Sequence, residues 1–498
     1  MDRRTLLSRA ALAVALSISA AAPAYAQATV AQGPSADPPP VEWPATPAGV
    51  LGRAVVDAIN DPDTVAITLF LTSSVAPGAA QPRAEMEAML RGIRRQGGRV
   101  TPRVVRQEPS GAVLMALMAR DVPAGLSLRV YPAAADSTRL DQLHFMRPLR
   151  HGDEFRPLPR ERMDADEMLS RIEEELRRLE SLDRLSGVVL IGRGDDIVYE
   201  ATFGRENPVT GERMTTRSRF HTASVPKMLT GTAIGQLVEA RRLSWDDTLG
   251  ELLPELPWTE PARAVTVHQL LTHTSGMPFA PDGPEPATST AQTARFAALP
   301  LRFAPGSEMS YSNEGFITLA AIVEKVSGQT FDAYMTEHVL RPAGMLTMRY
   351  GATPDSLVDR VLPSPHADGD WFGVMPRVAR PRGWGGGGAG GSHASARDLF
   401  AFSRALLGGR LVRREMLETL LTPRRPFDSG HYGYGFILWE ANGRAIAGHR
   451  GGGPRGMGLC NDMSMFLDGS WTVIVLTNYD APFCATVKQG IVEVLARN

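Results

Sequence analysis

Residues 220–229 read Phe-His-Thr-Ala-Ser-Val-Pro-Lys-Met-Leu, which places Ser224 three residues before Lys227. The apolar residues that follow have helical spacing, and Pro226 suits the first turn of a helix, where its missing N–H costs nothing. We therefore expect Ser224 at the N-terminus of a helix, with Lys227 one turn on and on the same face. The two side chains would then lie within reach of each other.

This arrangement favours nucleophilic catalysis. The helix dipole favours negative charge on Ser224 Oγ and disfavours protonation of Lys227, which makes the amine a better base. Only three of the 53 lysines and arginines are lysines, at positions 227, 325 and 488. Arginine keeps its proton near neutral pH, whereas a desolvated lysine can lose it. The segment alone would also fit a capping serine beside a solvated lysine, so its interpretation depends on the rest of the chain.

Apolar periodicity predicts how the segments around this one fold. Residues 168–179 carry a helical apolar stripe, and residues 188–199 predict a β-hairpin with a turn at 192–195. Near the other end, strands are expected at 463–466 and 471–476, followed by a helix at 485–495. Terminal helices flanking a central antiparallel sheet would bring both ends of such a domain together.

Four motifs resemble those of the serine β-lactamase and penicillin-binding-protein superfamily. In chain order they are Ser224-x-x-Lys227, Leu271-Thr-His-Thr-Ser-Gly276, Tyr311-x-Asn313 and His449-x-Gly451. The most similar branch contains class C β-lactamases, family VIII esterases and D-aminopeptidases. The resemblance covers about residues 165–498 and implies an α+β fold, in which helices flank an antiparallel sheet and a helical subdomain is inserted. The chain has no Gly-x-Ser-x-Gly elbow, which argues against an α/β-hydrolase.

The resemblance also implies roles for the motif residues. Ser224 would be the acylated nucleophile and Lys227 its general base. Tyr311 would share in proton transfer, and Asn313 would hydrogen-bond either the carbonyl side of the substrate or Lys227. The backbone N–H groups of Ser224 and Gly452 would form the oxyanion hole.

The last motif, at residues 448–452, departs from the usual pattern of the superfamily. Gly451 and Gly452 fit, because a side chain there would obstruct the acyl group. However, His449 stands where β-lactamases and penicillin-binding proteins usually have a lysine that helps to bind a carboxylate. A mostly neutral histidine binds a carboxylate less well, although Arg450 would compensate if its side chain pointed inward. We therefore expect poor hydrolysis of β-lactams.

The sequence thus predicts a serine hydrolase that cleaves an ester or amide bond through an acyl-enzyme on Ser224. Two alternatives stay open. One is a D-amino-acid-specific peptidase or carboxypeptidase, or a weak β-lactamase, acting on cell-wall material. The other is a catalytically idle protein that binds a peptide or glycan. For the enzymes, the expected partner is a small-molecule or peptide substrate.

Other patterns in the chain argue against further cofactors. No His-x-His-x-Asp cluster or cysteine pair at zinc spacing is present, so neither a metal nor another cofactor is expected. The glycine-rich stretch at 384–391 lacks the Lys-Ser or Lys-Thr of a phosphate loop and is expected to form a flexible wall near the site. His273, within the Leu271–Gly276 motif, is expected to have a structural hydrogen-bonding role.

Composition and the first residues indicate an exported protein. A chain of 498 residues with 43% hydrophobic residues and a net charge of −1 is typical of a soluble protein with two or three domains, and argues against nucleic acid as a main partner. Arginines at 3, 4 and 9 precede an apolar run that ends in Ala24-Tyr25-Ala26, which predicts a signal peptide at 1–26 and a periplasmic or secreted protein. An uncleaved anchor is disfavoured because the run is shorter than the roughly 20 residues that span a bilayer. No later stretch is apolar enough to span the membrane. The Arg3-Arg4 pair also resembles a twin-arginine signal.

Composition also divides the chain into segments. A disordered leader at 27–47 precedes a small α+β domain at 48–150, which resembles a nuclear-transport-factor-2-like cone around residues 58–63. A charged, proline-containing linker at 151–164 leads to the serine hydrolase domain at 165–498. One cysteine pair in a large domain is not a disulfide framework, so Cys460 and Cys484 are expected to be two buried free thiols rather than a bridge.

Overall fold

The computed structural model describes residues 41–498, apart from 64, 80, 82, 108–110, 120–124, 147–154, 160, 208–209, 282–285, 351–360, 362–386, 429, 453–458 and 480–482. The predicted signal peptide and residues 27–40 of the predicted leader lie outside the described residues. So do parts of the predicted linker and residues 384–386 of the glycine-rich stretch. Within the described residues, no helix is both long and apolar enough to cross a membrane.

The first folded part is a small α+β unit. Its three helices are α1 (Pro47–Asn60), α2 (Ala66–Ser74) and α3 (Arg83–Gly97). Its antiparallel sheet has the order β1-β2-β3-β4, formed by Val100–Gln107, Val113–Ala119, Gly125–Pro132 and Leu140–Met146. The apolar stripe of α1 packs on the sheet and contributes Val55 and Ile59 to a core shared with Met115 and Leu128. Trp43, in the segment expected to be leader, packs against this core.

The second part is built on an eight-stranded antiparallel sheet with the order β6-β5-β14-β13-β12-β11-β10-β9. Its strands are β5 (Gly187–Arg193), β6 (Asp196–Phe203), β9 (Arg425–Phe427), β10 (Gly430–Tyr432), β11 (Ile437–Ala441), β12 (Arg444–Gly452), β13 (Cys460–Phe466) and β14 (Trp471–Thr477). Strand β5 pairs with β14 along its whole length, so that Val188 lies opposite Leu476. The predicted hairpin and the predicted C-terminal strands are therefore confirmed, and they are neighbours.

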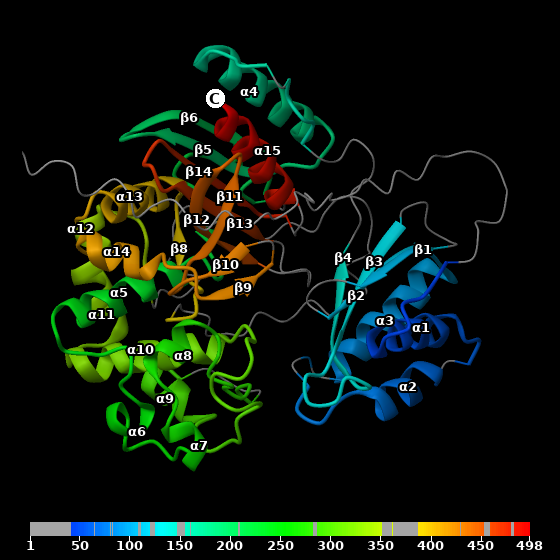
Figure 1. Cartoon of the computed structure of the whole chain (residues 1–498). Coiled ribbons are helices and arrows are strands. Elements are labelled where there is room, and N and C mark those ends of the chain that lie inside the picture. Colours follow the sequence, from blue (N-terminus) through cyan, green and yellow to red (C-terminus); the bar gives the residue numbers. More distant parts are fainter. Residues whose placement is uncertain are drawn as a thin grey trace, which may run out of the picture. The chain divides into compact units, whose positions relative to one another are not determined.

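Side chains on the central strands alternate between two separate apolar cores. On β5, Val188 and Leu190 face one core, whereas Val189 and Ile191 face the other. The second core is covered by α4 (Ala165–Ser181) and α15 (Phe483–Arg497), which lie close together on one face of the sheet (Figure 1). These are the two helices that apolar periodicity predicts, and both extend a few residues beyond the expected bounds.

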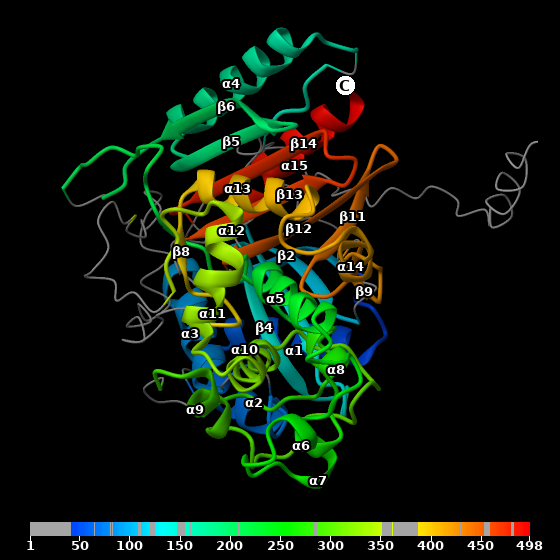
Figure 2. The same ribbon diagram turned by 90° about the vertical axis from the view of Figure 1, so that its left-hand side faces the viewer.

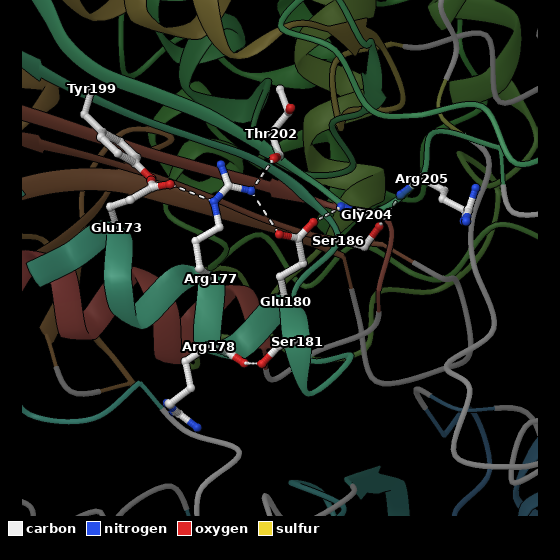
Figure 3. Close-up of polar contacts among 10 residues, drawn as sticks. All are labelled: Glu173, Arg177, Arg178, Glu180, Ser181, Ser186, Tyr199, Thr202, Gly204 and Arg205. Atoms are coloured by element: carbon white, nitrogen blue, oxygen red, sulfur yellow. Dashed lines mark hydrogen bonds and ion pairs between the residues drawn. The ribbon is translucent and has the colours of Figure 1, made fainter. Parts of the chain in front are cut away.

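Helix α4 is also joined to the edge strand by polar contacts (Figure 3). Arg177 donates to Glu173 at 2.7 Å and to Glu180 at 2.9 Å, and the Tyr199 hydroxyl donates to Glu173. Glu180 also accepts the backbone N–H of Gly204 at 2.8 Å. Ion pairs this exposed contribute little to stability, so we attribute the attachment of α4 mainly to its apolar face.

Helices cover the opposite face of the sheet and extend beyond its edge. Helices α5 (Lys227–Glu239) and α13 (Ala396–Leu407) contact strands of the sheet, and α14 (Arg414–Leu420) packs on α5. The inserted helical part contains α6 (Leu249–Leu252), α7 (Glu260–Arg263), α8 (Val267–Leu271), α9 (Ser289–Ala294), α10 (Asn313–Ser327), α11 (Phe331–Met335), the π-helical turn η1 (Thr336–Leu340) and α12 (Arg341–Ala343). Figures 1 and 2 both show α6 to α10 grouped at the end of this part that is remote from α4. Strand β7 (Phe220–His221), which precedes α5 in the chain, pairs with β8 (His393–Ala394). The predicted fold class is confirmed: a small α+β unit precedes, in the chain, a helix-flanked antiparallel sheet with a helical insertion.

The two cysteines form a disulfide, which corrects the expectation of free thiols. Cys460 begins β13 and Cys484 lies in the first turn of α15, with their Cα atoms 5.6 Å apart. This spacing is normal for a disulfide. The sequence predicts both elements, but it does not show that α15 folds back onto the start of β13.

Candidate active site

Ser224 lies in a tight turn between β7 and α5. The helix begins at Lys227 rather than at Ser224 as expected, and the turn is closed by the N–H of Lys227 bonding the Ser224 carbonyl at 3.1 Å. Ala223 has φ of 47°, a left-handed conformation that is uncommon for residues other than glycine. Such strain persists only where the surrounding structure fixes it, and it is frequent next to functional groups.

The Lys227 amine has three oxygen neighbours. It lies 3.3 Å from Ser224 Oγ, 2.8 Å from Asn313 Oδ1 and 2.6 Å from the backbone oxygen of Ala389. Asn313 and Ala389 offer only acceptors at these positions, so both must receive N–H groups from the amine. A neutral amine has two such groups and one lone pair, and the lone pair is then left for the Ser224 hydroxyl.

The surroundings of Lys227 favour this neutral form. The side chain is completely buried, and burial lowers its pKa to about 7, against a smaller opposing effect of Glu314. Removal of water penalises the ammonium ion more than the amine. The amine nitrogen also lies 4.8 Å from the ring centre of Tyr311 and 5.4 Å from that of Phe316. In a large fraction of the molecules, the Lys227 amine is therefore neutral and can act as a base near neutral pH.

Tyr311 and Asn313 lie at the start of α10. Ser312 is the N-cap of this helix, and its hydroxyl accepts the N–H of Gly315 at 3.0 Å. Burial raises the pKa of Tyr311, and its hydrogen bond with Ser224 and the charge of Arg450 only partly oppose this. The Tyr311 phenol therefore keeps its proton and is able to donate it.

His449 is held as a neutral imidazole. Its Nδ1 lies 2.6 Å from the carbonyl oxygen of Arg450, which can only accept, so Nδ1 carries the proton. Its Nε2 then accepts from the hydroxyl of Tyr432 at 3.0 Å. Burial and the charge of Lys227 lower the pKa of His449 to about 3. Neutral His449 therefore supplies no positive charge to the site.

Arg450 is engaged elsewhere. Its guanidinium forms an ion pair with Asp428, and both side chains are about half exposed, at 51% and 46%. Arg450 was expected to compensate for His449 if its side chain pointed inward. Its guanidinium is instead paired with a carboxylate of the protein itself.

The end of β12 runs alongside the turn that carries Ser224. A Cβ atom on Gly451 would lie 2.3 Å from the carbonyl oxygen of Thr222 and 3.0 Å from the backbone nitrogen of Ser224. Gly452 has φ of 107°, and a Cβ there would lie 2.4 Å from the carbonyl oxygen of Leu459. Only glycine allows the strand to approach the nucleophile this closely. The structure therefore brings together Ser224, Lys227 and Tyr311 with Asn313, His449, Gly451 and Gly452.

The family model named Beta-lactamase matches residues 169–493. The chain belongs to the β-lactamase family. It is 29% identical over 325 residues to penicillin-binding protein 4* of Bacillus subtilis. The match covers 59% of this chain and 68% of that protein. It is 28% identical over 370 residues to esterase EstB of Burkholderia gladioli, which covers 64% and 92% of the two chains.

Solved structures agree with this assignment. The crystal structure of a penicillin-binding protein from Bacillus halodurans matches with a TM-score of 0.55 and 30% identity, covering 64% of this chain and 98% of that one. The chain is therefore a serine hydrolase of the β-lactamase family. The matched region begins after residue 168, so the small α+β unit at 47–146 lies outside it.

Two groups of this β-lactamase-family site are absent from the motifs. One is the carbonyl oxygen of Ala389, which forms the shortest contact of Lys227. The other is Tyr432, a fully buried residue of β10 that donates to His449. A backbone acceptor leaves no mark in a sequence. Tyr432 is the last residue of β10, a three-residue strand whose position in the sheet only the structure reveals.

The described part of the glycine-rich stretch, 387–391, forms a tight turn beside the site, while its expected flexibility stays a prediction. Gly387 and Gly390 exchange backbone hydrogen bonds of 2.8 and 3.0 Å, and the N–H of Gly391 bonds the Ala223 carbonyl at 3.0 Å. The Gly388 carbonyl accepts from the hydroxyl of Thr230 at 2.8 Å. These bonds fix the Ala389 carbonyl in front of Lys227. Among the described residues, no group of three or more histidine, cysteine, aspartate or glutamate side chains could hold a metal ion.

Proposed function

We propose that this chain is an exported serine hydrolase that cleaves an ester or amide bond through an acyl-enzyme on Ser224. The observation that carries the proposal is the bonding of Lys227. Its nitrogen lies 2.8 Å from Asn313 Oδ1, 2.6 Å from the Ala389 carbonyl oxygen and 3.3 Å from Ser224 Oγ. In the neutral amine, whose two N–H groups go to Asn313 and Ala389, the lone pair would face Ser224 Oγ. Export rests on the predicted signal peptide at 1–26.

In the acylation step, neutral Lys227 accepts the proton of Ser224 while Oγ attacks the substrate carbonyl carbon. The backbone N–H groups of Ser224 and Gly452 stabilise the oxyanion, a role in which losing one donor typically costs about 100-fold to 1000-fold in rate. The Tyr311 phenol donates a proton to the departing alcohol or amine and is reprotonated from Lys227. The acyl group then remains on Ser224.

In the deacylation step, the same groups act in the reverse sense. A water molecule takes the place of the departed alcohol or amine, and Tyr311, with Lys227 as the final acceptor, removes its proton during attack on the ester carbonyl. The bond to Ser224 Oγ then breaks, and the proton returns from Lys227 to the serine. The product is a carboxylic acid, and the protein regains its starting protonation state.

The charges around the site favour neutral substrates. His449 is uncharged at neutral pH, its Nε2 is occupied by Tyr432, and Arg450 is paired with Asp428. A substrate carboxylate would have to compete with Asp428 for the arginine. We therefore place esters and uncharged amides ahead of β-lactams and peptides with a free carboxylate, and one relative is named an esterase.

A second candidate is a D-amino-acid-specific peptidase, a carboxypeptidase or a weak β-lactamase that acts on cell-wall material. It is favoured by the match to a protein named penicillin-binding protein 4*. An idle peptide- or glycan-binding protein is disfavoured, because such a protein would have no need to hold Ser224, Lys227 and Tyr311 in contact.

The proposal is tested by mass spectrometry after treatment with a fluorophosphonate probe. We expect one adduct, on Ser224, that is absent from Ser224→Ala. Turnover is then measured on short-chain esters, a chromogenic cephalosporin and D-amino-acid amides. Esters should be cleaved fastest, and a preference for D-amino-acid amides would promote the second candidate. A protein with neither an adduct nor turnover that depends on Ser224 would be no hydrolase.

Export is tested separately by expression with residues 1–26 intact. We expect the mature protein to begin at Gln27 and to be recovered from the periplasm or the medium. An unprocessed N-terminus in the cytoplasmic fraction would contradict export without affecting the proposed chemistry.

A further inference from the structure

His273 occupies an unusual place beside the site. It follows α8 in the Leu271–Gly276 motif, and its side chain is completely buried. Its backbone has φ of 58°, in the left-handed region. Asparagine, aspartate and histidine adopt this conformation more often than most residues, but it remains uncommon. A strained backbone at a buried histidine calls for a specific reason.

The backbone N–H groups of both neighbours of Tyr311, Ser310 and Ser312, bond to this single residue. The carbonyl oxygen of His273 accepts the N–H of Ser310 at 2.9 Å. The imidazole Nδ1 of His273 accepts the N–H of Ser312 at 3.1 Å. Main chain and side chain of His273 therefore hold the segment on either side of Tyr311, in front of the helix that carries Asn313.

The imidazole ring also contacts the ring of Tyr311. Their centres are 4.3 Å apart with an angle of 35° between the planes, and Tyr432 packs against the imidazole as well, at 4.6 Å. His273 does not touch the nucleophile, so any effect on catalysis must pass through the residues that it holds.

The hydrogen bonds of His273 fix its protonation. A backbone N–H bonds Nδ1, so Nδ1 carries no proton and the neutral ring has its N–H at Nε2. Burial, and after it the charge of Lys227, lowers the pKa of His273 well below its ordinary value. The acceptor at Nδ1 therefore persists throughout the neutral range.

Stability alone does not account for an imidazole here. Nε2 is buried and has no hydrogen-bond partner among the described residues. A buried N–H without a partner costs roughly 1–3 kcal/mol. An apolar ring would avoid that cost, but it would leave the N–H of Ser312 without its acceptor.

From this geometry we infer that His273 is a positioning residue for Tyr311. By bonding the N–H groups of Ser310 and Ser312 and packing on the Tyr311 ring, it holds the phenol at the distance from Ser224 that proton transfer requires. The inference rests on the proposed function, since it assigns Tyr311 a part in that chemistry.

Two substitutions separate the acceptor from the ring. His273→Asn keeps a side-chain acceptor and tolerates the left-handed backbone, whereas His273→Phe keeps an aromatic ring and removes the acceptor. The matched control is His268→Phe, which removes an imidazole that bonds the Tyr434 hydroxyl at 2.7 Å, away from residues 310–312. If the phenylalanine variant does not fold, His273→Leu replaces it, because leucine is close in size to asparagine and has no acceptor.

Each variant is assayed for kcat and KM on the best ester, for the rate of Ser224 labelling, for Tm and for amide hydrogen exchange at 310–312. We expect His273→Phe to lower kcat by about 100-fold, the loss typical of a misplaced catalytic group, with KM within about twofold. Exchange at 310–312 should accelerate. His273→Asn should recover at least about tenfold of the lost kcat, and His268→Phe should change neither kcat nor exchange.

The outcomes distinguish this inference from the proposed function. If the wild-type protein forms no Ser224 adduct and turns over no substrate, the proposed function fails and the inference fails with it. If the wild-type protein is active but His273→Phe keeps its kcat, only the inference is overturned. It is also overturned if the asparagine and phenylalanine variants lose kcat equally, in proportion to their loss of Tm.

Discussion

At the scale of single residues, Lys227 is the group whose chemistry is hardest to replace. Its side chain is completely buried, two acceptors contact its amine, and its role as a base needs a lone pair toward Ser224. Arginine brings the same charge but keeps its proton near neutral pH and spreads its donors in a plane. A chain in which arginine far outnumbers lysine therefore has lysine where the cation must be able to become neutral.

The substitution Lys227→Arg should leave the protein folded and reduce kcat/KM by at least about 1000-fold, within the range that general-base catalysis contributes. The measurement is ester hydrolysis beside circular dichroism. Lys325→Arg is the control, because Lys325 forms an exposed ion pair with Glu255 at 2.9 Å and should tolerate the exchange. An active Lys227→Arg enzyme would refute the assignment of Lys227 as the base.

The pH dependence of kcat/KM should show a rising limb centred near pH 7. The active form of Lys227 is the neutral amine, which predominates above its pKa of about 7, so the rate falls as pH decreases through that value. His449, with a pKa of about 3, and Tyr311, with a raised pKa, do not titrate in this range. A profile that is flat from pH 5 to pH 9 would show that no such base is needed.

The sequence predicts the members of the site better than their contacts. Ser224, Lys227, Tyr311 and Asn313 come together as the motifs imply, while the roles assigned to them remain predictions. The left-handed Ala223 and the Ala389 carbonyl were not predictable, because neither follows from a residue type. Asn313 had two expected partners, and the structure shows the bond to Lys227.

At the scale of elements, the turn at 387–391 shows how glycine can be required by packing rather than by flexibility. Gly390 has φ of 135°, and a Cβ there would lie 1.8 Å from the carbonyl oxygen of Ala223. A Cβ atom added to Gly388 would likewise lie 2.1 Å from the carbonyl oxygen of Phe316. The turn fills the space between the nucleophile turn and α10.

We expect Gly390→Ala to displace this turn and with it the Ala389 carbonyl, lowering kcat by about 100-fold and destabilising the fold by a few kcal/mol. Gly443→Ala is the matched control, since Gly443 has φ of 73° but no atom within 4 Å of the added Cβ. It should cost only about 1 kcal/mol and no activity. Urea unfolding and ester turnover measure the two effects, and equal losses in both variants would contradict the packing argument.

Apolar periodicity predicts the long elements of this fold but not the exact helix start or the shortest strands. Helices α4 and α15 and strands β5 and β14 are long enough for their apolar pattern to be read. The start of α5 was placed three residues too early, because Ser224 and Pro226 both suit a first helical turn. Strands β9 and β10, each three residues long, are too short to show alternation, although β10 supplies Tyr432.

At the scale of the whole molecule, the Cys460–Cys484 bridge joins the start of β13 to the last helix. Cys460 lies opposite Gly452 in the sheet, so the bridge fixes the strand that supports the predicted oxyanion hole. An intact bridge suits the oxidising compartment to which the predicted signal peptide would deliver the protein.

Replacing both cysteines by alanine should lower the free energy of unfolding by about 3 kcal/mol, since the bridge closes a loop across a sequence separation of 24. Urea unfolding of the oxidised wild-type protein, the reduced wild-type protein and the double variant measures this. The reduced and double-variant proteins should behave alike. Equal stability of the oxidised and reduced wild-type proteins would show that the bridge contributes nothing.

The pairing of β5 with β14 also constrains how the protein is made. Nearly three hundred residues separate Val188 from Leu476, its neighbour in the sheet. The ribosome must release almost the entire chain before the central strands can pair, and closing so long a loop is slow. Until then the apolar hairpin at 187–203 has no partner and is a target for chaperones or aggregation. Recovery of activity during refolding should therefore lag behind the recovery of helix, which makes hydrolysis a sensitive reporter of the last step of folding.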